Sequence, residues 1–253
     1  MKHVLLSLAL FASVAVFADE IESSNVIGVL PVTSSAKRTI VSVPWCAMSA
    51  TDNAAIQVSN IVKTANLTVD DTIHYFDGTA FQTWKLAADA TTGIKYWQSV
   101  NQVSADGVVT ETPSSAELAV ARGAAIMLIR NGDLTQPFYL YGQVGSGEVT
   151  TEITARGTSE SPVYTLVAPC ATTNVNLCAS GILQNAVDGD EINVIKESGA
   201  STSYTRKDDA WKRYKYADGS WQWVAAESVT VPKGMGFWYV SKSNSGSNPV
   251  FNW

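Results

Sequence analysis

Histidine, charged residues and paired cysteines are all scarce in this chain. Only two of its 253 residues are histidines, His3 and His74, and no Cys-x-x-Cys pair occurs. The usual ligand spacings of a zinc site are therefore missing, and we predict no metal and no cofactor. Charged residues make up only 16%, and the 17 Lys and Arg are outnumbered by 23 Asp and Glu. Because a nucleic-acid-binding face needs clustered cations, this balance excludes a nucleic-acid partner.

Long hydrophobic runs are also lacking, with one exception at the N-terminus. Residues 4–17 are almost entirely apolar, they follow Lys2, and small residues precede Asp19. This pattern predicts a secretory signal peptide over residues 1–18. Since no second run of membrane-spanning length follows, we expect a secreted chain, periplasmic, cell-surface or extracellular, without a transmembrane segment.

Cysteine is present three times, as Cys46, Cys170 and Cys178. Disulfides form readily outside the cytoplasm, and an odd count leaves at least one thiol over. A bridge between Cys170 and Cys178 would close a short loop after one strand, which geometry allows but does not require. We keep this disulfide as one of two open alternatives.

The chain contains an internal duplication. The segment 231–240 echoes the segment 120–129, because each has a basic residue, a glycine and then a run of apolar residues. Further marks recur in the same order, namely Pro44 with Pro169, Asp71 with Asp190, Trp97 with Trp221, Gly123 with Gly234 and Pro137 with Pro249. The offset falls from 124 at Trp97 to 111 at Gly123. We therefore predict an insertion of 13 residues between these two marks, over residues 103–115, as a surface loop or extra hairpin.

Within each copy, short runs rich in β-branched and aromatic residues alternate with turn signals such as Asp218-Gly219. This spacing predicts strands and hairpins. Helical spacing occurs only over residues 54–62, after a possible cap at Thr51-Asp52, and over residues 177–186. The predicted fold is all-β, with two tandem homologous antiparallel β-barrel or sandwich units, residues 19–147 and 148–253, each carrying one short helix.

A family resemblance rests on five features. They are residues 25–29, residues 39–44, the Gly-Asp-Glu-Ile strand that begins at Gly189, the tryptophan strand of residues 96–100 and 220–224, and the closing Gly-x-Gly-Phe-Trp of residues 234–238. Together they resemble an uncharacterised family of secreted two-repeat β-proteins from Verrucomicrobia-type bacteria. The resemblance implies export and a duplicated β fold, and it transfers no catalytic residue.

Catalytic constellations are few. His74 lies close in sequence to Asp70, Asp71 and Asp77, so a Ser-His-Asp arrangement stays open, but its repeat counterpart is Asn193 and no Gly-x-Ser-x-Gly elbow occurs. We therefore predict a surface histidine. Paired carboxylates suit glycoside hydrolysis or calcium binding, yet short acidic pairs at strand entries more often form turns, and no complete calcium loop is present. The pairs in question are Asp70 with Asp71, Asp188 with Asp190, and Asp208 with Asp209.

Aromatic residues are the feature that remains, with eight Trp and nine Tyr. Aromatic rings on β domains can stack against sugar rings. We expect Trp97, Trp221 and Trp238 in the core, because they fall on repeated marks or in apolar runs. The candidate ligand-binding residues, around the hairpin of residues 212–219, are Trp211, Tyr214, Tyr216 and Trp223. The cations between Arg206 and Lys215 are interrupted by Asp208 and Asp209, so we predict a solvated, mixed-charge hairpin there.

Three functions follow from these features. The leading prediction is an exported non-enzymatic structural or surface-interaction protein, with largely buried tryptophans and no concave polar pocket. The alternative is a carbohydrate-binding module, which requires at least two exposed aromatics arranged in one repeat. A hydrolase ranks third, since it requires His74 or a carboxylate pair at a pocket. The expected partner is a polysaccharide or another surface protein.

Overall fold

The computed structural model describes residues 27–48, 53–77, 80–105, 108–114, 117–153, 155–244 and 248–253. The predicted signal peptide and the predicted cap at Thr51-Asp52 lie outside these ranges. The described chain is nearly all β, as predicted, and contains two short helices. Neither helix has the length and apolar character needed to cross a membrane.

The first repeat consists of ten strands and one helix. In chain order they are β1 (Ile27–Val32), β2 (Arg38–Ser42), β3 (Ile56–Gln57), α1 (Val58–Ile61), β4 (Thr72–Phe76), β5 (Phe81–Ala88), β6 (Lys95–Ala105), β7 (Val108–Pro113), β8 (Ala119–Val120), β9 (Ala125–Ile129) and β10 (Phe138–Gln143).

The second repeat has the same elements in the same order. They are β11 (Thr150–Glu152), β12 (Val163–Val167), β13 (Val175–Asn176), α2 (Ile182–Asn185), β14 (Glu191–Ile195), β15 (Ser201–Lys207), β16 (Ala210–Ala217), β17 (Ser220–Ala225), β18 (Thr230–Val231), β19 (Phe237–Ser241) and β20 (Val250–Asn252).

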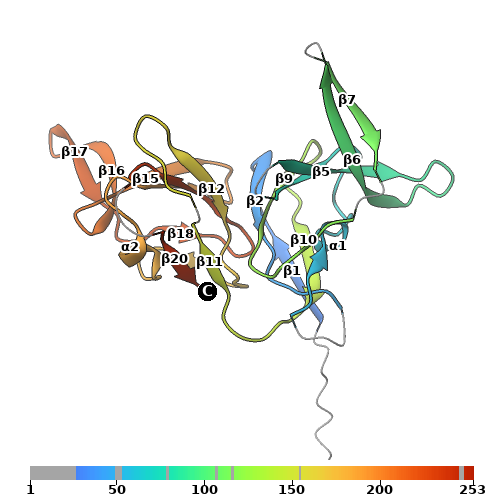
Figure 1. Cartoon of the computed structure of the whole chain (residues 1–253), viewed down its shortest axis with the longest axis horizontal. Helices are drawn as coiled ribbons and strands as arrows, with labels where there is room; N and C mark the ends of the chain where they lie inside the picture. The colour runs from blue at the N-terminus through green and yellow to red at the C-terminus, as the bar shows by residue number, and fades with distance from the viewer. Residues whose placement is uncertain are drawn as a thin grey trace, which may run out of the picture.

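Both repeats share one topology. The first six-stranded antiparallel sheet has the order β2-β9-β4-β5-β6-β7, and the second has the corresponding order β12-β19-β14-β15-β16-β17. Two two-stranded ribbons accompany each sheet, β1–β10 and β3–β8 in the first repeat, β11–β20 and β13–β18 in the second. The two units lie side by side in Figure 1. This correspondence supports the predicted duplication, whereas the described strands form no closed barrel.

Both helices are shorter than predicted, and α1 is shorter because residues within its predicted range are used in β pairing. Ile56 and Gln57 pair with β8, so α1 begins only at Val58. In the second repeat residues 177–181 form turns, and α2 begins at Ile182. One short helix per repeat is thus confirmed, with four residues in each.

The strand registers correct the predicted alignment of the two copies. The amide of Leu86 donates to the carbonyl of Asp71, and Arg206 donates to Asp190 in the same way, both at 2.8 Å. Leu86 pairs with Trp97 on β6, and Arg206 pairs with Trp211 on β16. The counterpart of Trp97 is therefore Trp211, and the predicted match of Trp97 with Trp221 is wrong.

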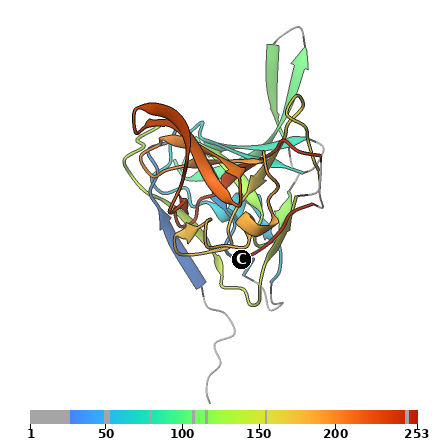
Figure 2. The same ribbon diagram turned by 90° about the vertical axis from the view of Figure 1, so that its left-hand side faces the viewer.

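The same registers correct the predicted insertion. The turn between β5 and β6 spans residues 89–94, whereas β15 and β16 are joined by Asp208 and Asp209 alone. The β6–β7 hairpin is also longer than β16–β17, and it projects from the molecule in Figure 2. The extra length of the first repeat is thus divided between two hairpins, because a hairpin can lengthen at its turn without disturbing the packed part of its strands.

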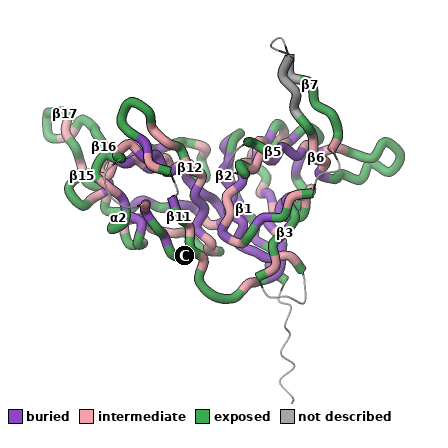
Figure 3. Tube along the Cα trace, viewed as in Figure 1, coloured by how far each residue is buried: buried purple, intermediate pink, exposed green. Residues whose placement is uncertain are grey.

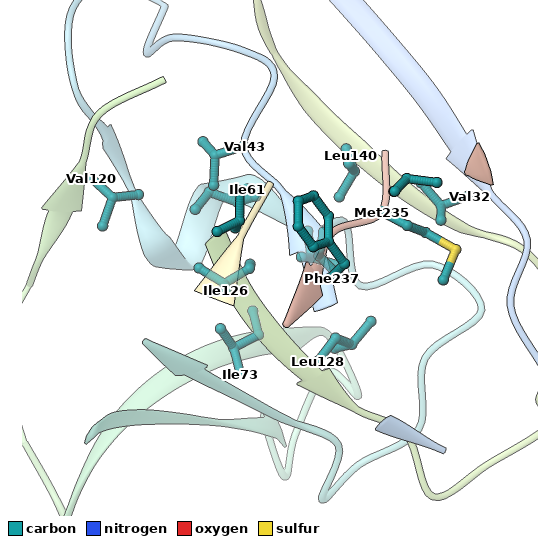
Figure 4. Packing of buried hydrophobic residues seen from close by; sticks show 14 of the residues in the cluster. Val32, Val43, Ile61, Ile73, Val120, Ile126, Leu128, Leu140, Met235 and Phe237 are labelled. Carbon is teal, nitrogen blue, oxygen red and sulfur yellow. The ribbon is translucent and has the colours of Figure 1, made fainter. Parts of the chain in front are cut away.

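One hydrophobic core runs through both repeats. The strand β2 meets the segment before β19, where Ser42 donates its amide to the carbonyl of Gly234 at 3.0 Å and Gly236 donates to Ile40 at 2.8 Å. Met235 and Phe237 are fully buried, and Figure 4 shows them among apolar side chains of the first repeat. The two units are therefore packed against each other rather than tethered loosely.

Candidate binding site on the β16–β17 hairpin

Four aromatic side chains lie on one face of the hairpin formed by β16 and β17. Tyr214 pairs with Trp223, and Tyr216 pairs with Trp221. Because side chains alternate along a strand and cross-strand partners share a face, all four project to the same side. Their exposed fractions are 57% for Tyr214, 63% for Tyr216, 64% for Trp221 and 41% for Trp223. We call this group the aromatic platform.

The rings of the platform contact one another. The rings of Tyr214 and Trp221 are stacked with centroids 5.7 Å apart and an interplanar angle of 22°. Trp223 lies 5.4 Å from Tyr214, and Tyr216 meets the edge of Trp221 at 6.0 Å. Such contacts hold aromatic side chains in place, which reduces the entropy lost when a ligand binds. Figure 3 shows that this hairpin is among the most exposed parts of the second repeat.

The first repeat builds the corresponding hairpin with non-aromatic residues at the four platform positions. There Val100 pairs with Pro113 in place of Tyr214 with Trp223, and Gln102 pairs with Glu111 in place of Tyr216 with Trp221. Glu111 accepts a hydrogen bond from Lys85 at 3.1 Å. Since the same scaffold forms with these residues, the fold does not require aromatic side chains at the platform positions.

The structure divides the predicted ligand-binding residues into two groups. Tyr214, Tyr216 and Trp223 belong to the platform, as their exposure shows. Trp211 does not, because its side chain is fully buried in the core. The prediction that Trp211 contacts a ligand is wrong: it occupies the same inward-facing position as the buried Trp97 of the first repeat.

Trp221 was missed by the sequence reasoning, which placed it in the core. Its strand begins directly after the Asp218-Gly219 turn, at the tip of the hairpin where no second layer covers it. The signal in the sequence was its closeness to that turn.

Of the other two tryptophans predicted in the core, Trp97 is buried, and its indole N–H donates to the carbonyl of Val62 at 2.8 Å. Trp238 is half-buried, and its ring lies 6.2 Å from that of Tyr164 in an edge-on contact.

The predicted mixed-charge hairpin is confirmed at the base of the platform. Arg206 forms ion pairs with Asp188 and Asp209. The ammonium group of Lys212 lies 2.8 Å from the Asp208 carboxylate, and this hydrogen bond lowers the pKa of Asp208 below its ordinary value. Lys212, which lies on the same face as the platform, is thus paired locally.

His74 of β4 pairs with Thr83 of β5. Its two ring nitrogens are 3.0 Å and 3.1 Å from the hydroxyl oxygens of Thr72 and Thr83. Its counterpart Asn193 makes the corresponding cross-strand contact with Ser203. Partial burial, and then the charge of Arg38, lower the pKa of His74. Its ring bonds are to threonines rather than to a serine and an aspartate, so this geometry does not assemble a triad.

The candidate carboxylate pairs are turn-forming elements. Asp71 is buried and accepts backbone hydrogen bonds from Thr68 at 2.9 Å and from Asn131 at 2.6 Å. Asp190 is buried too, and Arg156 lies against its carboxylate at 2.9 Å. The hydroxyl of Tyr239 also donates to Asp190, and burial together with this bond raises the pKa of Tyr239. Saturated with internal bonds, these two aspartates hold the fold in place.

The proposed disulfide does not form in this structure. Cys170 and Cys178 carry free thiols. Their sulfur atoms face different carbonyl groups, that of Pro44 at 3.8 Å and that of Ala226 at 3.6 Å. Among the described residues, no group of three or more His, Cys, Asp or Glu side chains is arranged to hold a metal ion.

The geometry of the aromatic platform alone indicates a binding site. Comparison of the chain with protein-family models, with curated proteins and with solved structures gave no match.

Proposed function

We propose that this chain is an exported, non-enzymatic binding protein that recognises carbohydrate through the aromatic platform. One observation carries the proposal: four aromatic side chains are exposed on one face of a hairpin, and the corresponding four positions of the first repeat hold no aromatic residue. Exposing such side chains to water costs free energy unless a ligand covers them. Kinship with the secreted family named above stays a prediction.

Carbohydrate is the ligand class that fits this surface best. A pyranose ring has an apolar C–H face that can stack on Trp or Tyr, and its hydroxyl groups need polar partners beside the ring. The platform offers the Tyr214 and Tyr216 hydroxyls, and Lys212 lies on the same face of the sheet. An exposed row of rings suits a chain of sugar units better than one small molecule, because it is open rather than enclosed.

The alternatives are less well supported. The structural role that led the sequence analysis expects largely buried tryptophans, and Trp221 and Trp223 do not meet this expectation. Hydrolysis needs a base or a carboxylate pair at a pocket, whereas His74 and Asp190 are bonded within the fold. Binding without catalysis is therefore the function that we put forward.

Affinity electrophoresis of the mature chain through gels containing soluble polysaccharides tests the proposal. We expect at least one polysaccharide to retard the protein, and the double variant Trp221→Ala with Trp223→Ala to lose that retardation. The matched control is Tyr96→Ala, which removes an exposed aromatic (45%) from the first repeat and should keep full retardation.

Two outcomes would contradict the proposal. Retardation that survives in the double variant would place sugar binding elsewhere. Unchanged migration in every polysaccharide gel would favour another surface protein as the partner of the platform.

A further inference from the structure

A cleft lies between the outer faces of the two six-stranded sheets. Its volume is ≈ 1100 Å³. The first repeat lines it with Arg38 of β2 and Met127 of β9, among others, and the second repeat with Asn193 of β14, Ser203 of β15 and Trp238 of β19. The cleft therefore exists only because the two repeats, which lie side by side in Figure 1, pack together.

The wall of the cleft and the aromatic platform belong to one face of the second sheet. Trp238 pairs with Asn193, and Asn193 pairs with Ser203. Thr205, on the same face as Ser203, pairs with Lys212, from which alternation leads to Tyr214. The strands β19, β14, β15 and β16 are consecutive neighbours, so about 14 Å separates the first from the last. A ligand of several sugar units can thus reach from the platform into the cleft.

The second-repeat wall carries the groups that a sugar ring needs. The half-buried ring of Trp238 is held edge-on by Tyr164 and offers a stacking surface. Beside it, the side-chain oxygen of Asn193 accepts a hydrogen bond from the Ser203 hydroxyl. The Asn193 side-chain N–H groups are then left to donate to a ligand hydroxyl.

The charge of the cleft is unlike that of the whole protein. The net charge of the chain is −6, yet the described residues that line the cleft include two cations, Lys37 and Arg38, and no carboxylate. Arg38 is exposed and forms no side-chain hydrogen bond or ion pair within the described residues. A guanidinium group in this state is free to bind a carboxylate through two parallel hydrogen bonds.

We propose that this cleft binds a carboxylated sugar unit, a uronate, with its ring on Trp238 and its carboxylate at Arg38. The inference rests on the proposed function and narrows it, because it makes the ligand an acidic polysaccharide. Selection for the acid arises at the cleft, while the platform binds neighbouring units of either kind.

Polysaccharides that differ only in the charge of the carboxyl group provide the test. Polygalacturonate and hyaluronate are each compared with their methyl esters, which keep the sugar backbone and remove the charge. Calorimetric titration of the mature chain should give, for at least one of the two, an affinity for the acid at least about tenfold higher than for the ester, as expected for a charge-assisted hydrogen bond. This preference should shrink at high salt.

Arg38→Gln tests the assigned residue. We expect this variant to bind acid and ester within about twofold of each other, because its carboxamide carries no charge. Asn193→Ala should weaken both forms together. The matched control is Lys233→Gln, which changes the net charge equally but lies outside the cleft lining and should keep the wild-type preference.

The outcomes separate the two proposals. Equal binding of acids and esters by the wild type, or a preference that survives in Arg38→Gln, overturns the uronate inference and leaves the platform proposal standing. If the double variant Trp221→Ala with Trp223→Ala binds acid and ester as tightly as the wild type does, the proposed function itself fails.

Discussion

Trp211 and Trp221 lie in the same hairpin, yet one is fully buried and the other is 64% exposed. Trp211→Ala would empty a space in the core, so we expect it to lower the free energy of unfolding by about 3–5 kcal/mol. Trp221→Ala should change it by less than about 1 kcal/mol, as usual for surface positions. Urea denaturation followed by circular dichroism measures both values. Two small losses would contradict the core position of Trp211, and two large ones the surface position of Trp221.

His74 gives the fold a dependence on pH. Burial lowers its pKa in the folded protein below the ordinary value of about 6.5. The unfolded chain therefore takes up the proton first as the pH falls, so stability is complete above about pH 6.5 and declines as the pH drops toward the lower, folded pKa. Replacing His74 with Asn, the residue at the corresponding position of the second repeat, should remove this decline.

Melting temperatures of the two proteins between pH 5 and pH 8 check the role of His74. We expect the difference between wild type and His74→Asn to change across this range in favour of the variant at low pH. A difference that is constant with pH would mean that His74 has the same pKa in both states.

Single residues also show where prediction from sequence stops. Alternating apolar and polar residues predict which side chains share a face of a strand, and this holds for Tyr214 and Tyr216. The same pattern does not tell which face is covered by a second layer. The sequence therefore predicts an exposed Trp211 and a buried Trp221, the opposite of what the structure shows. The error arises because the hairpins of the two repeats differ in length, so that Trp97 aligns by offset with Trp221 although its structural counterpart is Trp211.

At the level of structural elements, the turn before β19 is where the second repeat packs into the core of the first. Gly234 has a positive φ of 69°, and a Cβ atom there would lie 2.5 Å from the side chain of Val32. Gly219, in the β16–β17 turn, also has a positive φ, of 81°, but its Cβ would meet nothing within 4 Å. Alanine at Gly219 would thus add backbone strain alone, whereas alanine at Gly234 would add backbone strain and a steric clash.

We expect Gly219→Ala to lower the free energy of unfolding by about 1–2 kcal/mol, the cost of the left-handed conformation. Gly234→Ala should cost more, since it carries the same strain and also displaces packed side chains. Chemical denaturation of both variants provides the comparison. Equal costs would indicate that the side chains around Gly234 can move aside, so that this turn does not hold the two repeats in a fixed arrangement.

The elements themselves were largely predictable. Strands, turns such as Asp218-Gly219 and one helix per repeat follow from local periodicity and from residues that favour positive φ. The first helix is shorter than predicted because Ile56 and Gln57 pair with β8, which no local pattern reveals. Closure into a barrel was likewise beyond local patterns, because it depends on how distant strands meet.

For the whole molecule, the shared core predicts that the two repeats unfold together. The hydroxyl of the buried Ser42 donates to the carbonyl of Pro169 at 2.7 Å, across the junction. Calorimetry should give one transition, with equal calorimetric and van't Hoff enthalpies. Ser42→Ala leaves a buried carbonyl without its partner and should lower the stability of that single transition by about 1–3 kcal/mol. Two separate transitions would contradict a shared core.

The cleft is a property of the whole molecule, because neither repeat forms it alone. Arg38 and Trp238 lie two hundred positions apart and in different repeats, and only the packing of the two sheets places them at one cavity. Nothing in the spacing of either residue signals a common site. Sequence reasoning therefore identified most of the platform, which is local to one hairpin, and missed the cleft entirely.

The central claim is that a carbohydrate covers the platform, and tryptophan fluorescence tests it most directly. Acrylamide should quench a fraction of the emission in the free protein, because Trp221 and Trp223 are exposed while most other tryptophans are at least half-buried. A polysaccharide that binds should protect this fraction, and the double variant Trp221→Ala with Trp223→Ala should lack it from the outset. Binding of a polysaccharide that leaves the quenchable fraction unchanged would contradict the account.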